Sequence, residues 1–156
     1  WEDFDDERRL HNLSNTLERL LQLHAIPIIN ENDSVSSDEY SVGDNDTLAA
    51  LTAKCIHADL VVLLSDIDGL YTKDPHSDPS AQLIPVVEKI TDTIEALAKG
   101  VGSSLGTGGM ATKVSAAKIV TKEGIDMIIA NGAKADILYD IVDGKQAGTR
   151  FLGERL

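Results

Sequence analysis

The chain is short of cysteine and of aromatic residues, and each shortage excludes a class of protein. Cys55 is the only cysteine among the 156 residues, so no disulfide can form within the chain, and a reducing, cytoplasmic location is expected. Cys55 lies in an apolar stretch, which predicts a buried thiol that fills space in the core. Aromatic residues make up 4% of the chain, too few for a platform on which nucleic-acid bases could stack.

Basic residues and long apolar runs are also scarce. There are 14 Lys and Arg residues against 26 Asp and Glu residues, which gives a net charge of -12. Binding along a phosphate backbone needs clustered basic residues, so a general nucleic-acid-binding role is excluded. No apolar run approaches the roughly 18 residues that a membrane-spanning helix requires, and the first residues show no secretory signal pattern. The length favours one domain over residues 1–156, and the absence of an initial Met suggests that the chain begins within a longer protein.

Amphipathic helices alternate with short apolar strands along the chain. Leucines recur at three- and four-residue spacing over residues 5–23, which indicates a helix. Alternation of this kind favours an open, mostly parallel sheet with helices packed against it. The turn-rich segment 72–82 is predicted to be a surface loop. Further helices are expected at 46–57, 92–99, 110–123 and 136–142, and strands at 26–29, 60–64, 125–130 and 148–152.

Polar clusters follow three of the predicted strands. They are Asn-Glu-Asn-Asp at 30–33, Ser-Asp-Ile-Asp-Gly at 65–69 and Asn-Gly at 131–132. Because ligands of such sheets bind at the carboxyl ends of the strands, we expect these clusters to lie along one edge. A calcium loop at 65–69 is excluded, since Leu64 and Pro75 would occupy its first and twelfth ligand positions. Asp66 could face a nucleotide there, whereas Asp68 and Gly69 are better explained as a turn.

The sequence Gly-Asp-Asn-Asp at 43–46 opens the second predicted helix, which Asp46 is expected to cap. A helix N-terminus attracts anions, but two carboxylates there suit a metal ion, an ammonium group or a positioned lysine. The simpler interpretation is a helix cap and a polar turn. The cluster at 30–33, only ten residues upstream, favours a binding site over that interpretation.

A glycine-rich segment precedes the helix predicted at 110–123. Glycines at 100, 102, 106, 108 and 109 let backbone N–H groups approach a phosphate closely, and Lys113 follows within the first turn of the helix. Backbone donors, a helix N-terminus and a cation are what phosphoryl transfer requires. The segment is not a Walker A loop, because it lacks Gly-Lys-Ser/Thr, and it does not follow a strand as a Rossmann fingerprint does. A generic glycine-rich linker is the alternative.

Five motifs occur in one order over residues 5–152 and together resemble the amino acid kinase family, in particular its glutamate-phosphorylating members. They are IPIINEND, VGDNDTLAA, LLSDIDGLYTKDP, LGTGGMATK and IIANG. The resemblance implies a three-layer αβα sandwich and ATP-dependent phosphorylation of the γ-carboxylate of L-glutamate, the first step of proline biosynthesis. ATP and Mg2+ are the implied cofactors, and a homo-oligomer is expected.

The resemblance also implies roles for individual residues. Asp33 and Asn45 match glutamate-binding residues, and Asp46 matches an aspartate that orients catalytic lysines. Lys113 matches the lysine that stabilises the transferring phosphoryl group. ATP-binding positions are matched by Ser65, Asp66, Thr107, Gly108, Gly109, Met110, Ala111, Thr112 and Lys113.

The chain departs from the family pattern in one respect. The family's kinases begin with a strand bearing Lys-x-Gly-Ser, and these 156 residues contain no such strand. We therefore expect the chain to be the carboxyl-terminal part of a kinase domain, with negligible activity alone. The alternatives are a non-catalytic nucleotide-binding module and another member of the family, such as a uridylate, aspartate or carbamate kinase.

Overall fold

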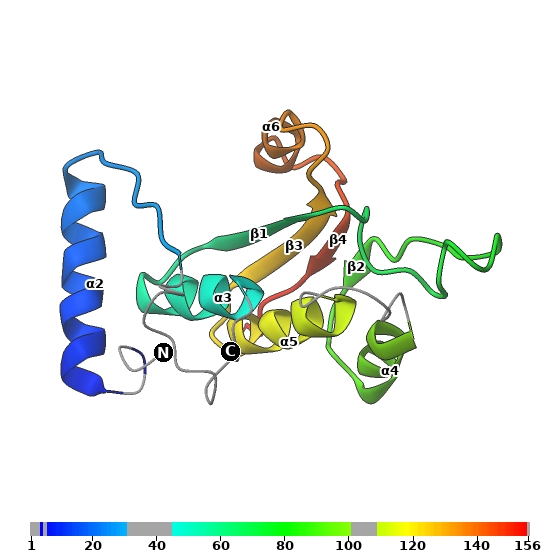
Figure 1. Cartoon of the computed structure of the whole chain (residues 1–156), viewed down its shortest axis with the longest axis horizontal. Coiled ribbons are helices and arrows are strands. Elements are labelled where there is room, and N and C mark those ends of the chain that lie inside the picture. The colour runs from blue at the N-terminus through cyan, green and yellow to red at the C-terminus, as the bar shows by residue number, and fades with distance from the viewer. Residues whose placement is uncertain (1–3, 5, 31–44, 101–108, 156) are drawn as a thin grey trace.

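The computed structural model describes residues 4, 6–30, 45–100 and 109–155, which form helices around one four-stranded sheet (Figure 1). The helices are α2 (Glu7–Gln22), α3 (Asn45–Cys55), α4 (Asp92–Gly100), α5 (Met110–Thr121) and α6 (Ile137–Val142). The strands are β1 (Leu60–Ser65), β2 (Val86–Val87), β3 (Asp126–Asn131) and β4 (Thr149–Phe151).

The sheet has the strand order β1-β3-β4-β2 and is mostly parallel, as the sequence predicts. β1 runs parallel to β3 along its whole length, with Ser65 opposite Asn131 at the carboxyl ends. β2 and β4 are also parallel, while β3 and β4 are antiparallel. β3 therefore has a parallel partner, β1, on one side and an antiparallel partner, β4, on the other.

Both faces of β3 are covered, which confirms the layered αβα arrangement. Met127 and Ile129 face the main core, which α3 and α5 cover. Ile128 and Ala130 face the opposite side and pack with Ile141 of α6. Figure 1 shows α3 and α5 on one side of the sheet and α6 on the other.

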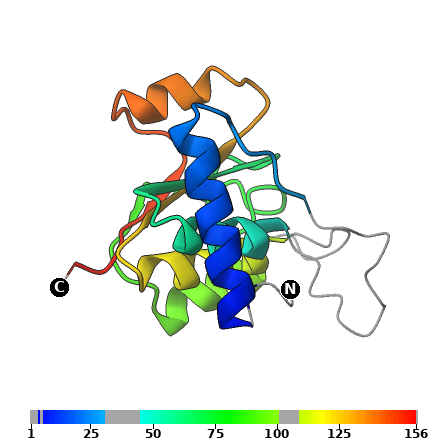
Figure 2. The same ribbon diagram turned by 90° about the vertical axis from the view of Figure 1, so that its left-hand side faces the viewer.

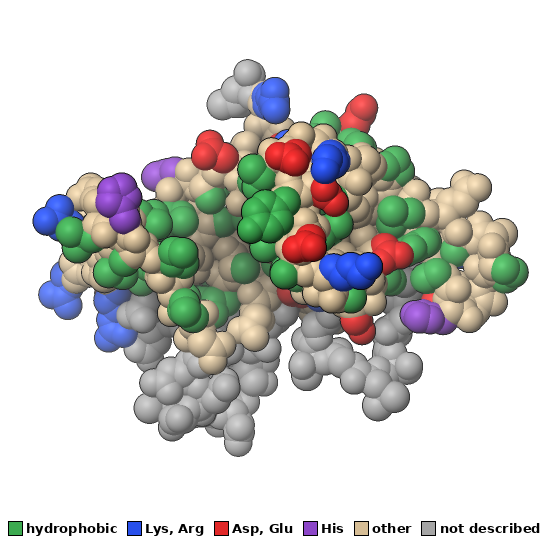
Figure 3. All heavy atoms as spheres, turned by 90° about the horizontal axis from the view of Figure 1, so that it is seen from above, with side chains coloured by type: hydrophobic (Ala, Val, Ile, Leu, Met, Phe, Trp, Pro, Cys, Tyr) green, Lys and Arg blue, Asp and Glu red, His purple; other side chains and the backbone are tan. Residues whose placement is uncertain are grey.

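The second helical layer is thin. Figure 3 looks onto the side of α6 and shows hydrophobic side chains exposed there among acidic and basic ones. Leu138, Tyr139 and Val142 are the exposed apolar residues of α6. The helix thus uses one side to cover the sheet and leaves the other in solvent.

Helix α2 lies beside the sheet rather than over it, as Figures 1 and 2 both show. Asp6 caps the helix by accepting a hydrogen bond from the N–H of Arg9 at 2.9 Å. The hydroxyl of Ser14 donates to the carbonyl of Cys55 at the end of α3, at 3.1 Å. Cys55 is buried and unpaired, as predicted.

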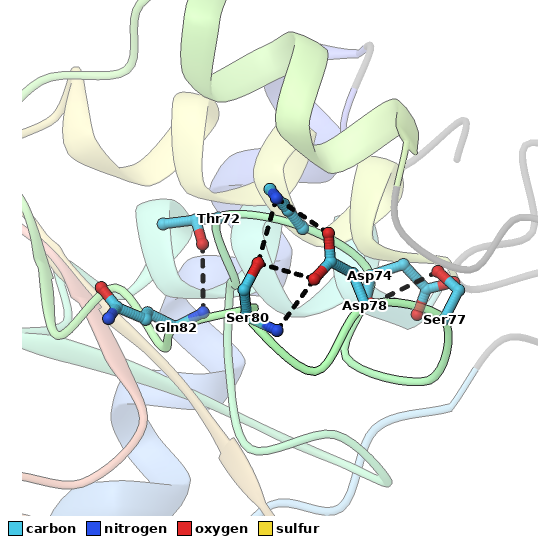
Figure 4. Close-up of polar contacts among 7 residues, drawn as sticks. Thr72, Asp74, Ser77, Asp78, Ser80 and Gln82 are labelled. Carbon is cyan, nitrogen blue, oxygen red and sulfur yellow. Dashed lines mark hydrogen bonds and ion pairs between the residues drawn. The ribbon is translucent and has the colours of Figure 1, made fainter.

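The predicted surface loop at 72–82 is confirmed, and its own side chains fix its shape (Figure 4). The carboxylate of Asp78 accepts hydrogen bonds from the N–H and the hydroxyl of Ser80 at 2.8 and 2.6 Å, and from Lys73 Nζ at 2.8 Å. Lys73 and then Ser80 hold the pKa of Asp78 well below its usual range. Asp74 similarly accepts from the N–H of His76 at 2.9 Å.

Two sequence predictions require correction, and one short strand was not predicted. Residues 26–29 do not form a strand: Ile26 and Ile28 are 89% and 95% exposed, and Pro27 has no N–H to donate. Strand conformation persists only where backbone groups find partners, and no described strand pairs with this segment. Helix α3 begins at Asn45, so Asp46 lies in the first turn instead of capping the helix, and β2, only two residues long, was not predicted.

In the ranges that the structure describes, no helix combines the length and the apolar character needed to cross a membrane.

A partly buried ion pair joins β3 to β4, with Asp126 buried and Arg150 exposed, and it predicts how stability depends on pH. The carboxylate of Asp126, a residue only 7% exposed, accepts hydrogen bonds from Arg150 Nε and Nη2 at 2.9 and 2.6 Å and from the N–H of Gly153 at 2.8 Å. Burial by itself would raise the pKa of Asp126, but the Gly153 N–H and the Arg150 guanidinium outweigh it and lower the pKa below its ordinary value.

We expect Asp126→Asn to lower the free energy of unfolding at pH 7 by about 1.5–3 kcal/mol, the usual worth of hydrogen bonds to a charged group. Because the folded-state pKa is depressed, this stabilisation is present above the unfolded pKa of about 4 and is lost as pH falls through the folded pKa. Thermal unfolding of the wild type and of Asp126→Asn from pH 7 to pH 2 measures this stabilisation. The difference in Tm should shrink on acidification, and a constant difference would contradict the assignment. Asp143→Asn, at an exposed position on the end of α6, is the control.

Candidate functional site

The structure describes most of the residues that the sequence analysis assigned to a site. Asn45, Asp46, Ser65, Asp66 and residues 109–113 lie within the described ranges. Asp33, Thr107 and Gly108 lie outside them.

The first turns of α3 and α5 meet through an ion pair between Asp46 and Lys113. Lys113 Nζ lies 3.0 Å from Asp46 Oδ2, and the two side chains are only 9% and 14% exposed. A lysine is rarely buried to this degree unless a carboxylate pairs with it. The packing of α3 against α5 therefore places an oriented ammonium group at the start of α5.

Thr112 strengthens the same contact. Its hydroxyl lies 3.0 Å from Asp46 Oδ2 and 2.7 Å from the carbonyl of Gly109, within hydrogen-bonding distance of both. Gly109 precedes α5 in extended conformation and, as a glycine, has no side chain of its own with which to cap the helix. The N–H groups of the first turn of a helix have no partner within the helix itself, so this end of α5 can bind an anion.

Ser65 and Asp66 lie where β1 ends. The hydroxyl of Ser65 donates to Asp66 Oδ1 at 3.1 Å, and Asp66 is exposed. α3 leads into β1 and α5 leads into β3, so both helices begin on the side where these parallel strands end.

The predicted convergence of polar clusters at this edge is confirmed for two of the three. Asn131, the last residue of β3, donates from Nδ2 to Asp68 Oδ1 at 2.8 Å. Residues 31–33 of the remaining cluster lie outside the described residues, but Asn30 is described. Asn30 and Asn45 line one groove of about 500 Å³, whose other walls are mostly apolar.

A second groove, of about 460 Å³, lies along α4 and α5. Four lysines line it: Lys54, Lys99, Lys118 and Lys122. Lys54 forms an ion pair with Glu123, and Lys118 forms one with Glu95. Of the predicted site residues that the structure describes, only Ala111 borders it. The Asp46–Lys113 pair lies in neither groove.

Sequence reasoning missed two contacts of this site. The approach of Thr112 to Asp46 could not be found from spacing, because the two residues are 66 positions apart. The Asp68–Asn131 bond had a detectable signal, since both residues follow strands predicted to be parallel. A turn is by itself a sufficient explanation of Asp68, and it hides this signal.

Comparison with known proteins decides the family. The model of the amino acid kinase family matches residues 2–131. The chain belongs to the amino acid kinase family.

Relatives within this family are close in sequence but longer. A protein named glutamate 5-kinase from Clostridium tetani is 55% identical over 150 residues, which is 96% of this chain and 56% of that protein. A protein of the same name from Thermoanaerobacter sp. strain X514 is 51% identical over 151 residues, 97% of this chain and 41% of the relative. The chain thus spans about half the length of the curated relatives it matches.

The fold agrees with the family. The solved structure of a carbamate kinase from Giardia lamblia superposes with a TM-score of 0.61 at 23% identity, covering 90% of this chain and 49% of that structure. At this identity the match shows the amino acid kinase fold alone.

Proposed function

We propose that this chain provides the ATP-binding side and part of the acceptor side of a kinase that transfers the γ-phosphoryl group of ATP to the γ-carboxylate of L-glutamate, as the first step of proline biosynthesis. The observation that carries the proposal is the buried Asp46–Lys113 pair at the start of α3 and α5. The relatives of this chain named glutamate 5-kinase support the choice of substrate.

The reaction is a displacement at phosphorus. A γ-carboxylate oxygen of glutamate attacks the γ-phosphorus of ATP, the bond from that phosphorus to the β,γ-bridging oxygen breaks, and ADP leaves together with an acyl phosphate. Negative charge on the transferring group must be stabilised by fixed donors. The ammonium of Lys113 brings a positive charge to the start of α5, and Asp46 holds it in one orientation.

Backbone groups at the start of α5 would hold the phosphates of ATP. The helix begins at Met110 with Gly109 before it, an arrangement that suits a phosphate chain. Ser65 and the exposed Asp66 would contact the nucleotide from the end of β1. The start of α5 and the end of β1 come from different parts of the chain, and contacts from both would fix the phosphates relative to the acceptor.

Magnesium would be held chiefly by the nucleotide. Within residues 4, 6–30, 45–100 and 109–155, no three His, Cys, Asp or Glu side chains form a group that could bind a metal. Mg2+ in such kinases ordinarily takes one or two carboxylates and otherwise phosphate oxygens and water. When bound, the ion neutralises charge on the phosphates.

Asn45 is the described residue proposed to bind glutamate. We expect Asn45→Ala, in the complete enzyme, to raise the glutamate KM by about tenfold, equivalent to one hydrogen bond of roughly 1.4 kcal/mol. The change in kcat should stay small, because the part of glutamate that it contacts changes little during transfer. Steady-state kinetics with varied glutamate measures the split. Asn15→Ala, at an exposed position of α2, is the control, and a loss confined to kcat would contradict this role.

The proposed function is tested with the complete gene product. ATP-dependent acyl hydroxamate formation should proceed with glutamate, and aspartate and carbamate should be poor substrates under the same conditions. Preferential turnover of carbamate or aspartate would move the protein to another branch of the family. ATP binding without turnover of any acceptor would favour a non-catalytic nucleotide-binding module.

A further inference from the structure

The carboxylate of Asp68 joins the ends of β1 and β3. Asp68 Oδ1 accepts a hydrogen bond from Asn131 Nδ2 at 2.8 Å, and Oδ2 accepts one from the hydroxyl of Tyr71 at 3.0 Å. Both oxygens are thus used, although Asp68 is exposed and its partners lie on different elements. A residue that served only as a turn former would not need this cross-strand contact.

The orientation of the Asn131 amide is fixed independently. Asn131 Oδ1 accepts a hydrogen bond from the N–H of Ala133 at 2.9 Å, so its Nδ2 must face Asp68. The N–H of Gly132 donates to the carbonyl of Ser65 at 2.8 Å. The end of β3 therefore contacts the chain on both sides of Asp66, at Ser65 and at Asp68.

Strand β4 confines the backbone of the same turn. The N–H of Leu70 donates to Thr149 Oγ1 at 2.8 Å, and a Cβ on Gly69 would lie 2.5 Å from that oxygen. A Cβ on Gly148 would lie 2.8 Å from the carbonyl of Asp68. The turn after β1 is thus held by β4 through its backbone and by Asn131 and Tyr71 through the Asp68 carboxylate.

We propose that Asp68 is a positioning residue for the nucleotide: its bonds to Asn131 and Tyr71 fix the turn that presents Ser65 and Asp66 to ATP. This inference rests on the proposed function, because it takes Ser65 and Asp66 as nucleotide contacts. It predicts that disturbing the Asp68–Asn131 pair weakens ATP binding and leaves glutamate binding and the chemical step largely unchanged.

An exchange of the two side chains gives the sharpest test. Asn131→Asp places two carboxylates opposite each other across a 2.8 Å contact, and like charges at that distance repel. We expect the ATP KM to rise by about tenfold, a cost of roughly 1.4 kcal/mol, with the glutamate KM unchanged. Asp68→Asn combined with Asn131→Asp restores one amide and one carboxylate in reversed order, and should return the ATP KM to near the wild-type value.

Two further variants cover the case in which Asn131→Asp folds poorly. Asp68→Ala removes both bonds and should raise the ATP KM by at least as much as Asn131→Asp. Tyr71→Phe removes one bond and should have a smaller effect. Asp78→Asn is the matched control, because Asp78 is a carboxylate of the nearby loop in Figure 4 whose partners are Lys73 and Ser80; its ATP KM should not change.

Direct binding separates this inference from the proposed function. The dissociation constant of Mg-ADP, measured by calorimetry on the complete protein and each variant, should follow the same pattern whether or not glutamate is the acceptor. If the wild type binds Mg-ADP but does not phosphorylate glutamate, the proposed function fails and the constants still test Asp68. Unchanged nucleotide binding in Asp68→Ala, no recovery in the exchanged pair, or no nucleotide binding by the wild type would each overturn the inference.

Discussion

Replacing Lys113 by alanine in the complete enzyme is expected to lower kcat by about 100- to 1000-fold, the usual cost of losing a donor that stabilises transition-state charge. The ATP KM should rise far less, because the ammonium is needed most when charge shifts during transfer. The structural basis is the position of Lys113 in the first turn of α5, where Asp46 holds its Nζ at 3.0 Å. Steady-state kinetics with saturating magnesium gives both constants.

Stability must be separated from catalysis in this experiment. Removing one partner of a buried ion pair commonly costs about 3–5 kcal/mol, and Lys113→Ala leaves the Asp46 carboxylate without its ammonium. Thermal unfolding and ATP binding should therefore be measured on the same preparation. Lys113→Arg keeps the charge, but its planar fork does not replace a compact ammonium, so we expect only partial recovery of kcat.

Lys122 provides the matched control at the other end of the same helix. It is exposed and follows the last residue of α5, so Lys122→Ala should leave kcat within about twofold, as surface substitutions usually do. A folded Lys113→Ala enzyme with kcat within about threefold of wild type would remove Lys113 from the proposed catalytic residues. It would also remove the main support for phosphate binding at the start of α5.

The sequence predicted several helices and strands correctly because their signals are local. The leucine spacing of α2, the apolar run of β1 and the glycine after α5 each depend on a few neighbouring residues, and the structure confirms these elements. The parallel pairing of β1 with β3 followed from the alternation of strands and helices. The placement of Asp66 at the end of β1 could therefore be predicted without coordinates.

The contacts within the site could not be predicted in this way. Asp46 and Lys113 are 67 positions apart, and their approach depends on how α3 packs against α5. The resemblance to a family indicated that they act together, but only the fold gives the distance. The failure at residues 26–29 has the same origin: an apolar β-branched run indicates a strand, but a strand requires a neighbour for its backbone, and local sequence does not reveal whether one is present.

Replacement of Gly148 gives the prediction with the largest expected effect on stability, because this residue has a positive φ and also lies very close to other backbone segments. Its φ is +61°, which side chains disfavour, and a Cβ would lie 1.9 Å from the carbonyl oxygen of Ile129. Gly144 has φ +75° but no atom within 4 Å of an added Cβ, so it isolates the backbone cost. We expect Gly144→Ala to cost about 1–2 kcal/mol and Gly148→Ala about 3–5 kcal/mol, a range reserved for severe disruption of packing or backbone.

The stability lost in Gly148→Ala beyond that lost in Gly144→Ala measures how firmly β4 is held against β3, next to the proposed nucleotide edge. The added methyl group must push Thr149 away from its partner Ile129, and it also approaches the carbonyl of Asp68. At about 2–4 °C per kcal/mol for a protein of this size, Gly148→Ala should lower the Tm by roughly 10 °C and Gly144→Ala by much less. Equal losses in the two variants would show that the left-handed backbone alone accounts for the cost, and that the contact between β4 and the end of β3 is looser than the structure shows.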